Sequence, residues 1–284
     1  SLNYDFNDNF SMTYRLGLDT YSELQEILYN KGGASGNLAV KNGYYRTINI
    51  NNTIWNQDLI VNWKKEFSDK FSMSALLGGN TRFDSYMQTG VASQGQLAFG
   101  LFRHSNFSTS SSNDAYSGGS MNNGVDERRY GVYSNITFDY SDYLFLNLSA
   151  RNDWTSTVEA ENRSILYPGG SVSFIPTTAF DWKSSNLNDL KLRFGYGTSA
   201  GYPSPYTTRN VLSQAARAFD VNGAVTTTHS VSNTLGNPNL KPELHGEAEF
   251  GVEAAMFNNK LRFDVSIYEK NTTNLITNAP IDPS

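Results

Sequence analysis

Apolar and polar residues alternate strictly along residues 247–268, in two runs separated by Asn258-Asn259. Every second residue is apolar in 248–256 and again in 261–267, while most of the intervening residues are charged or small. A period of two gives a β-strand one apolar face and one polar face. Because asparagine tolerates positive φ angles, the Asn-Asn pair predicts a two-residue turn, and the whole stretch predicts a β-hairpin.

The turn also predicts the register of this hairpin. It places Val252 opposite Val265 on one face and Glu253 opposite Asp264 on the other, with Arg262 diagonal to them. A slip of one residue would move the apolar set of one strand to the polar face, so the pattern specifies this pairing strongly. Such a sheet is either half of a β-sandwich or the wall of a water-filled barrel.

The same alternation elsewhere in the chain predicts an all-β protein with about ten antiparallel strands. They lie at residues 1–6, 10–22, 52–66, 71–86, 126–140, 143–155, 166–178, 190–198, 243–257 and 260–274.

Short and long connections interleave between these strands. The short connections are 7–9, 67–70, 141–142, 180–189 and 258–259, and the long ones are 23–51, 87–125, 156–165 and 199–242. All short turns therefore fall at one rim of the sheet and all long loops at the other. Outer-membrane barrels have this arrangement, with short periplasmic turns and long extracellular loops. Within the first long loop, residues 23–28 predict one short helical turn.

The polar face indicates the size of the barrel. Its residues are mostly Gly, Ser, Asn, Glu and Arg, which need water or a plug beside them, whereas side chains fill a barrel of about eight strands. We therefore expect a transmembrane antiparallel β-barrel that is larger than the strands visible here. Residues 261–267 then contact lipid with their apolar face, and Asn258-Asn259 lies at the periplasmic rim. The predicted lumen-lining residues are Glu249, Glu253, Arg262 and Asp264.

Composition narrows the possible partners and the compartment. The net charge of −5 and the lack of a long basic cluster argue against a nucleic-acid partner. There is no cysteine, which excludes a disulfide framework and thiolate chemistry. No apolar run reaches the roughly 18 residues of a membrane-spanning helix. The chain opens on a strand pattern without Met or a signal peptide, so we expect a mature piece of a longer protein.

Catalytic or metal-binding chemistry is not indicated. The three histidines, His104, His229 and His245, are scattered and lack ligand spacing, so we expect solvated loop histidines and no metal site. There is no nucleophile elbow and no phosphate-binding glycine loop. We predict a protein that is not an enzyme and that needs no cofactor.

Binding is better supported than reaction, because aromatic, Arg and Asp residues gather in or beside the predicted long loops. Such side chains stack on and hydrogen-bond to polar ligands such as oligosaccharides or peptides. For any single residue, an interfacial aromatic girdle or packing within the loop is the competing interpretation. The candidate substrate-binding residues are Arg103, Tyr116, Asp153, Trp154, Tyr202, Tyr206 and Arg209.

Four segments in residues 130–280 resemble the barrel of TonB-dependent outer-membrane receptors, more narrowly the SusC/RagA-like branch of Bacteroidetes. They are 151–156 followed by Tyr167-Pro168 (R-x-D-x-S-S … FP), 190–197 (LKLR-x-x-YG), 237–243 (NP-x-LK-x-E) and 268–276 (Y-x-K-x-T-x-x-L). The segments follow the family order, and together they are fairly specific. Pro242 stands where the narrower branch usually has Trp, and residues 1–125 match only in strand rhythm.

The resemblance implies that residues 1–284 are part of a receptor barrel of about 22 strands. It implies further strands and a plug domain outside this chain, and active import of an oligosaccharide or peptide. TonB would act through that plug, and a SusD-like lipoprotein would cap the barrel from the cell surface. The chain would supply barrel wall in the outer membrane, with extracellular loops that face the substrate. A non-transporting surface barrel or adhesin and a secreted β-sandwich lectin remain as alternatives.

Overall fold

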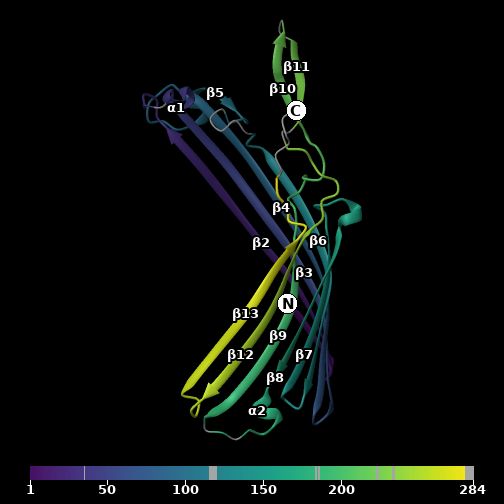
Figure 1. The fold of residues 1–284 in the computed structure, drawn as a ribbon. Coiled ribbons are helices and arrows are strands. Elements are labelled where there is room, and N and C mark those ends of the chain that lie inside the picture. Colours follow the sequence, from purple (N-terminus) through teal and green to yellow (C-terminus); the bar gives the residue numbers. More distant parts are fainter. Residues whose placement is uncertain are drawn as a thin grey trace, which may run out of the picture. The chain divides into compact units, whose positions relative to one another are not determined.

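A computed structural model describes residues 1–278 except 35, 115–119, 183, 185, 222–223 and 232–233. Eleven strands form one antiparallel sheet, in the order β1-β2-β3-β4-β6-β7-β8-β9-β12-β13, with β5 paired to β4 (Figure 1). A second sheet contains β10 and β11 alone. The strands are β1 (Leu2–Asn7), β2 (Phe10–Tyr29), β3 (Tyr44–Ser68), β4 (Phe71–Gln96), β5 (Phe107–Ser111), β6 (Asn123–Tyr140), β7 (Leu144–Thr155), β8 (Ser164–Phe174), β9 (Leu187–Gly201), β10 (Leu212–Val221), β11 (Ala224–Val231), β12 (Glu243–Met256) and β13 (Leu261–Thr273).

Helical structure in the described part of the chain is limited to short turns. The helices are α1 (Leu38–Lys41), α2 (Pro176–Ala179) and the 3₁₀ turns η1 (His104–Asn106) and η2 (Ala160–Asn162). No helix in the described ranges is long and apolar enough to cross a membrane.

All ten predicted strands are present, and the prediction of an all-β protein is confirmed. The helical turn predicted at 23–28 is wrong, because β2 continues through it to Tyr29. The strand predicted at 166–178 ends earlier, at Phe174, because Pro176 begins α2, and proline favours the first position of a helix. The loops predicted at 23–51 and 87–125 are shorter than expected, because β3 begins at Tyr44 and β4 ends at Gln96.

The predicted hairpin has the predicted register. Val252 pairs with Val265 and Glu253 with Asp264, and Lys260 N donates to Phe257 O at 3.3 Å across the turn. Asn258 and Asn259 have φ angles of 55° and 62°, as the turn requires, and Phe257 shares this left-handed conformation. The polar and apolar faces of β12 therefore continue onto β13.

Two compact units divide the chain: residues 1–15, 57–81 and 128–284 form the first, and residues 16–56 and 82–127 the second. All five short connections lie in the first unit. Backbone hydrogen bonds link neighbouring strands and connections there, from Lys64 N to Asn9 O, Ser141 N to Lys70 O, Ile175 N to Tyr143 O and Phe257 N to Asn186 O. The predicted rim of short turns is therefore confirmed.

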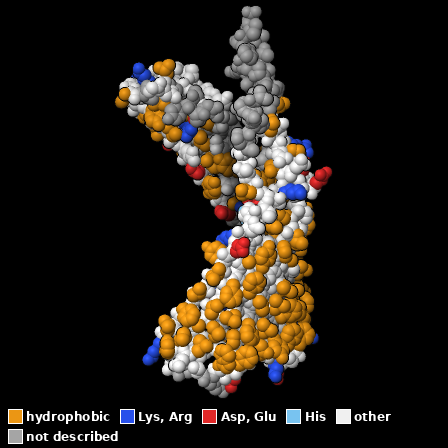
Figure 2. Space-filling model, viewed as in Figure 1, with side chains coloured by type: hydrophobic (Ala, Val, Ile, Leu, Met, Phe, Trp, Pro, Cys, Tyr) orange, Lys and Arg blue, Asp and Glu red, His pale blue; other side chains and the backbone are white. Residues whose placement is uncertain are grey.

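One face of the sheet in the first unit is apolar and exposed. Figure 2 shows the hydrophobic side chains as a broad band over the lower part of this unit. The band includes Leu144, Leu146, Leu148, Val172, Phe194, Phe250, Val265 and Ile267, each at least 37% exposed. A packed sandwich buries such a face against a second sheet, whereas a membrane barrel presents it to lipid. The sandwich alternative is therefore wrong.

Aromatic residues border this band at both ends. At the short-turn rim, successive ring contacts of 5.6–6.2 Å link Tyr140, Tyr143, Phe174, Phe180 and Trp182. At the other end of the band, ten residues after Leu144 in β7, Trp154 stacks on Tyr130 with a distance of 5.1 Å between the ring centroids. Ten residues of strand span about 33 Å, and a tilt of about 40° projects this onto roughly 25 Å. That height matches the apolar band of an outer-membrane barrel.

The second unit has a small core of its own. Tyr44, Ile48, Ile50, Ala92 and Met121 are buried together. The buried Asp114 accepts hydrogen bonds from Tyr44 Oη at 2.6 Å and from Arg46 Nη1 at 2.9 Å. These contacts hold the stretch that follows β5 against β3.

His104 also belongs to the second unit, and the expectation of a solvated loop histidine is wrong for it. Its ring nitrogens lie 2.8 Å from the hydroxyls of Thr47 and Ser93, and its ring lies 4.5 Å from that of Tyr45. Burial lowers the pKa of His104, so the neutral imidazole is favoured. We assign it a structural role, which is to fix η1 on β3 and β4.

Candidate functional site

The polar face of the first unit carries the candidate site. It is formed by the odd-numbered residues of β7, β8, β9 and β12, together with the even-numbered residues of β13 that pair with β12. The pairing aligns Ser149, Gly169, Gly197, Glu247 and Lys270 in one row across these five strands. Side chains far apart in the sequence therefore lie side by side on this face.

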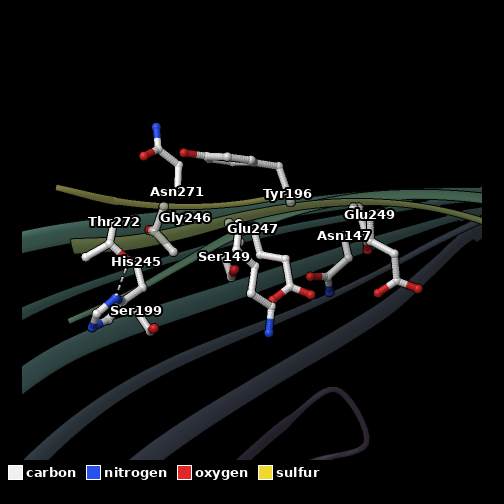
Figure 3. Close-up of a pocket in the computed structure, with 17 residues that line it drawn as sticks. Asn147, Ser149, Tyr196, Ser199, His245, Gly246, Glu247, Glu249, Asn271 and Thr272 are labelled. Carbon is white, nitrogen blue, oxygen red and sulfur yellow. Dashed lines mark hydrogen bonds and ion pairs between the residues drawn. The ribbon is translucent and has the colours of Figure 1, made fainter. Parts of the chain in front are cut away.

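A cavity of about 800 Å³ lies on the sheet where Gly169, Gly195 and Gly197 leave the polar face bare. We call it the glycine hollow. Figure 3 shows the labelled residues Asn147, Ser149, Glu247 and Glu249 on one side of the sheet there, while Tyr196 and Asn271 lie on the opposite side. The floor of the hollow is main chain, and its surroundings are hydroxyl, amide and charged groups.

Charged pairs border the hollow. Lys270 Nζ lies 3.0 Å from Glu247 Oε2, and Glu249 Oε1 lies 3.8 Å from Arg193 Nε. At the end of the hollow nearer the long loops, His245 Nδ1 lies 2.9 Å from Thr272 Oγ1. Within the described ranges, no three His, Asp or Glu side chains form a group that could hold a metal ion.

Arg193 forms ion pairs with the carboxylates on the short-turn side of the hollow. It forms an ion pair with Glu253, and its Nη2 donates to Asp264 at 2.6 Å and to Ser266 Oγ at 2.8 Å. Its side chain crosses β12 over Gly251, where a Cβ atom would collide with it. Arg193 on β9 therefore bonds to β13 across the intervening strand.

Three of the predicted lumen-lining residues, Glu249, Glu253 and Asp264, meet around this arginine. Arg262 lies on the same face, where it pairs with Ala255, and these carboxylates form ion pairs with Arg193 and, in the case of Glu253, also with Lys191. The sequence alone does not reveal these ion pairs, because the contact of Arg193 with β13 depends on which residue of β9 pairs with Gly251. That these side chains line a lumen stays a prediction.

Asp153 is the centre of a second cluster, towards the long loops. This buried carboxylate accepts hydrogen bonds from Tyr202 Oη at 2.9 Å, from Arg151 Nε at 2.7 Å and from Tyr167 Oη. Opposite it, Gly131 leaves the space that the carboxylate occupies. The structure thus brings together two predicted residues, Asp153 and Tyr202, and adds Arg151 and Tyr167. The Arg-x-Asp spacing was a signal for Arg151, since residues two apart in a strand share a face.

Tyr202 connects this cluster to the loop that follows β9. The guanidinium of Arg129 lies 5.4 Å from the Tyr202 ring centroid, a cation–π contact. Burial, together with the hydrogen bond and charge of Asp153, raises the pKa of Tyr202. The phenol therefore stays protonated as a donor, and it holds the first residue after β9 to the wall.

The same loop is held at a second point. Arg209 donates from Nε and Nη2 to the two carboxylate oxygens of Glu159, at 2.7 and 2.8 Å. The base of the loop is closed by hydrogen bonds from Asn237 N to Thr207 O at 3.1 Å and from Gly236 N to the Asn210 side chain at 2.7 Å. The predicted residue Arg209 therefore joins two long loops.

We expect the Arg209–Glu159 tie to withstand acid until well below pH 4. Hydrogen bonds from Arg209 and Thr208 lower the pKa of Glu159 to about 2, so its contribution is present above the ordinary pKa of about 4.3. The contribution is lost as the pH falls from there through 2. The measurement is the distance between spin labels on the two loops of the full-length receptor at pH 7, 4 and 2.

Two comparisons complete the test of this tie. Arg209→Gln should lengthen the distance already at pH 7, and 1 M salt should weaken the exposed pair at every pH. Lengthening of the wild-type distance between pH 7 and 4 would contradict this assignment.

The remaining predicted residues lie apart from these clusters. Tyr206 is 61% exposed and has a φ angle of 64°, which is rare for an aromatic residue. Trp154 stacks on Tyr130 on the apolar face, as the competing girdle interpretation expects, and its contact with substrate stays a prediction. Arg103 is exposed in the second unit, before η1. Tyr116 lies outside the described residues.

Comparison with known proteins places this geometry in a family. The family described as "TonB dependent receptor-like, beta-barrel" matches residues 1–284. TonB-dependent receptor P26 of Formosa agariphila is 26% identical over 278 residues, which are 92% of this chain and 25% of that protein. TonB-dependent receptor P3 of the same organism is 26% identical over 153 residues, 53% of this chain and 15% of that protein. The chain thus spans a quarter or less of these relatives.

Solved structures agree on the fold. The RagAB peptide transporter matches with a TM-score of 0.83 and 20% identity, over 97% of this chain and 30% of that chain. The ferric-catecholate import receptor Fiu of E. coli matches with a TM-score of 0.53 and 12% identity, over 95% of this chain and 39% of that chain. With a family match along its whole length, the chain belongs to the TonB-dependent receptor-like β-barrels of the bacterial outer membrane.

Proposed function

We propose that this chain supplies wall and extracellular loops to an outer-membrane receptor that imports a polar oligomer, an oligosaccharide or a peptide. TonB would energise the import through a plug outside this chain, and a SusD-like lipoprotein would cover the outer mouth. One observation carries the proposal. A single sheet has an apolar band bordered by aromatic rings on one face and a polar, charged face with a hollow on the other.

The polar face supports passage of a solute. A wall that only supports surface loops gains nothing from bare glycines beside charged groups, and glycine lowers the stability of a strand by about 0.5–1 kcal/mol relative to alanine. The curated relatives are named TonB-dependent receptors, and a structural neighbour is named a peptide transporter. These names support import as the activity and leave peptide and oligosaccharide as the two substrate classes.

The loop residues support capture at the outer face. Asp153 and Tyr202 anchor the loop after β9, and Arg209 ties it to the loop after β7. We assign these three a positioning role, because their polar groups are already engaged. Tyr206 lies in this anchored loop and is exposed, and we propose that it contacts substrate. Arg103 and Tyr116 are retained as proposed contacts on other loops.

Uptake by cells tests the proposal. A strain that lacks the receptor gene is complemented with the full-length receptor, and the depletion of labelled peptides and oligosaccharides from the medium is measured. We expect depletion of one class, and loss of that depletion when the TonB-contacting segment is deleted. Binding at the cell surface without depletion would instead identify an adhesin and overturn the proposal.

A further inference from the structure

Two of the segments that resemble the receptor family meet at one carboxylate. Segment 237–243 ends at Glu243, the first residue of β12, and segment 268–276 runs along β13 and past its end. Glu243 Oε1 accepts a hydrogen bond from Ile276 N at 2.6 Å. Because Ile276 follows β13, a side chain at the start of β12 holds the main chain that leaves the neighbouring strand.

A short turn fixes the chain just before Glu243. In this turn, Asn237 O accepts a hydrogen bond from Leu240 N at 3.2 Å, and its side-chain oxygen accepts one from Asn239 N at 2.9 Å. Asn237 N in turn donates to Thr207 O at 3.1 Å. The stretch that leads into β12 is therefore bound to the loop after β9 and, through Glu243, to the segment after β13.

His245 lies beside the same carboxylate. Its Nε2 is 3.4 Å from Glu243 Oε2, and its Nδ1 is 2.9 Å from Thr272 Oγ1 on β13 (Figure 3). Both side chains lie over Gly201 of β9, where a Cβ atom would be 3.0 Å from Glu243 Oε2 and 3.1 Å from His245 Nε2. The pair thus occupies the space that this glycine leaves, and it connects three strands.

The surroundings of His245 leave Glu243 as its charge partner. The side chain of Glu243 is 18% exposed and that of His245 is 42% exposed, so the imidazole exchanges protons with water. The next charged groups along this face are Glu247 and Lys270, which pair with each other at 3.0 Å. On β9, His245 pairs with Ser199, which is uncharged. A proton gained by His245 therefore acts on its contact with Glu243.

Protonation of His245 strengthens the contacts that are already present. Histidine is the side chain whose charge ordinarily changes between pH 8 and 5. A neutral imidazole has one donor and one acceptor nitrogen, whereas the imidazolium donates from both. The oxygens of Glu243 and Thr272 are in place to accept these two hydrogen bonds. Acid therefore adds a charge-assisted contact to Glu243 without a rearrangement.

We infer that Glu243 and His245 form a clamp that positions the extracellular segment after β13, and that this clamp holds more tightly as the pH falls from 8 towards 5. Glu243 supplies the fixed contact to Ile276, and His245 supplies the dependence on pH. Both act as positioning residues. The inference goes beyond the proposed function, because it holds whether the substrate is a peptide or an oligosaccharide.

The test measures the distance between spin labels at positions 239 and 277 of the full-length receptor in lipid vesicles, at pH 8 and pH 5.5. Asn239 lies in the turn before Glu243, Thr277 follows Ile276, and both labelled positions are exposed. A released segment appears as a second population with a longer distance. The fraction of molecules in this population is compared between variants.

Three variants separate the two roles. Glu243→Ala removes the acceptor of Ile276 N, Glu243→Gln keeps an acceptor oxygen but removes the charge, and His245→Gln removes the titrating group. The matched control is Glu269→Gln, an exposed carboxylate that pairs with Ala248 on the opposite face of the sheet. His104 and His229 remain in every variant, so a pH response that they cause persists in His245→Gln.

Glu243→Ala should raise the released fraction about tenfold at both pH values, equivalent to a loss of about 1.4 kcal/mol. In the wild type, the released fraction should fall about threefold between pH 8 and pH 5.5, as expected for a partly exposed ion pair. His245→Gln should keep the wild-type fraction at pH 8 and lose this fall. Glu243→Gln should show a smaller rise than Glu243→Ala and no pH response, and Glu269→Gln should behave as wild type.

Unchanged distances in both Glu243 variants would overturn the clamp, and a pH response that persists in His245→Gln would overturn the role of His245. Should Glu243→Ala not assemble in the membrane, Glu243→Gln and His245→Gln still decide the question. Failure of the wild-type receptor to import either substrate class would overturn the proposed function and leave these distances unaffected.

Discussion

Leu148→Arg is expected to lower the free energy of unfolding of the full-length receptor by about 2–4 kcal/mol, whereas Ser149→Arg should change it little. Leu148 lies near the middle of the apolar band, and a charge at the bilayer midplane of a barrel costs about that much. Ser149 is the next residue in β7 but faces the glycine hollow, where an arginine remains hydrated. Denaturant unfolding in lipid vesicles measures both values.

This pair of variants tests the assignment of the two faces with the same substitution at adjacent positions. Equal destabilisation by both arginines would mean that neither face is hydrated. A larger effect at Ser149 would reverse the assignment of the lipid-facing side.

Asp153→Ala is expected to destabilise the receptor by about 3–5 kcal/mol and to release the loop after β9. Asp153 is only 6% exposed and receives three hydrogen bonds, so its removal leaves Arg151 and two phenols without their acceptor. Hydrogen exchange should show faster exchange of amides in residues 202–210, and the midpoint of denaturant unfolding should fall. Tyr202→Phe should release the loop with a smaller loss of stability.

Asp264→Ala is the matched control for Asp153→Ala. Asp264 is also paired with an arginine, but its side chain is 58% exposed, so we expect a loss within about 1 kcal/mol. A similar loss for both variants would show that burial does not set the value of Asp153.

The strands near the short-turn rim were predictable because one physical constraint acts on them. Each strand there separates lipid from water, so alternation is strict, as in residues 247–268, and the Asn-Asn turn sets the register. Beyond the membrane the constraint disappears. The far ends of β2, β3 and β4 have mixed sequences, and Glu23–Leu28 has helix-forming composition although it is held in β2 by its place in the sheet.

Residues of the candidate site could be predicted only where their own type and their place near a long loop indicated binding. Asp153 and Tyr202 were identified as polar or aromatic groups near long loops, but their contact depends on the pairing of β7 and β8 and on the path after β9. The hollow was not predicted, because the glycines of β8 and β9 are 25 or more residues apart in the sequence. Only the register places Gly169 beside Gly197.

The crossing of Arg193 over Gly251 makes two positions in different strands dependent on each other. A side chain at 251 would displace the guanidinium and release Asp264 and Ser266, while a short residue at 193 would leave room at 251 for any β-former. Their effects on stability should therefore be non-additive, as expected for residues in direct contact. In related barrels, we expect glycine at the position of Gly251 to accompany a long basic residue at that of Arg193, and larger residues to accompany short ones.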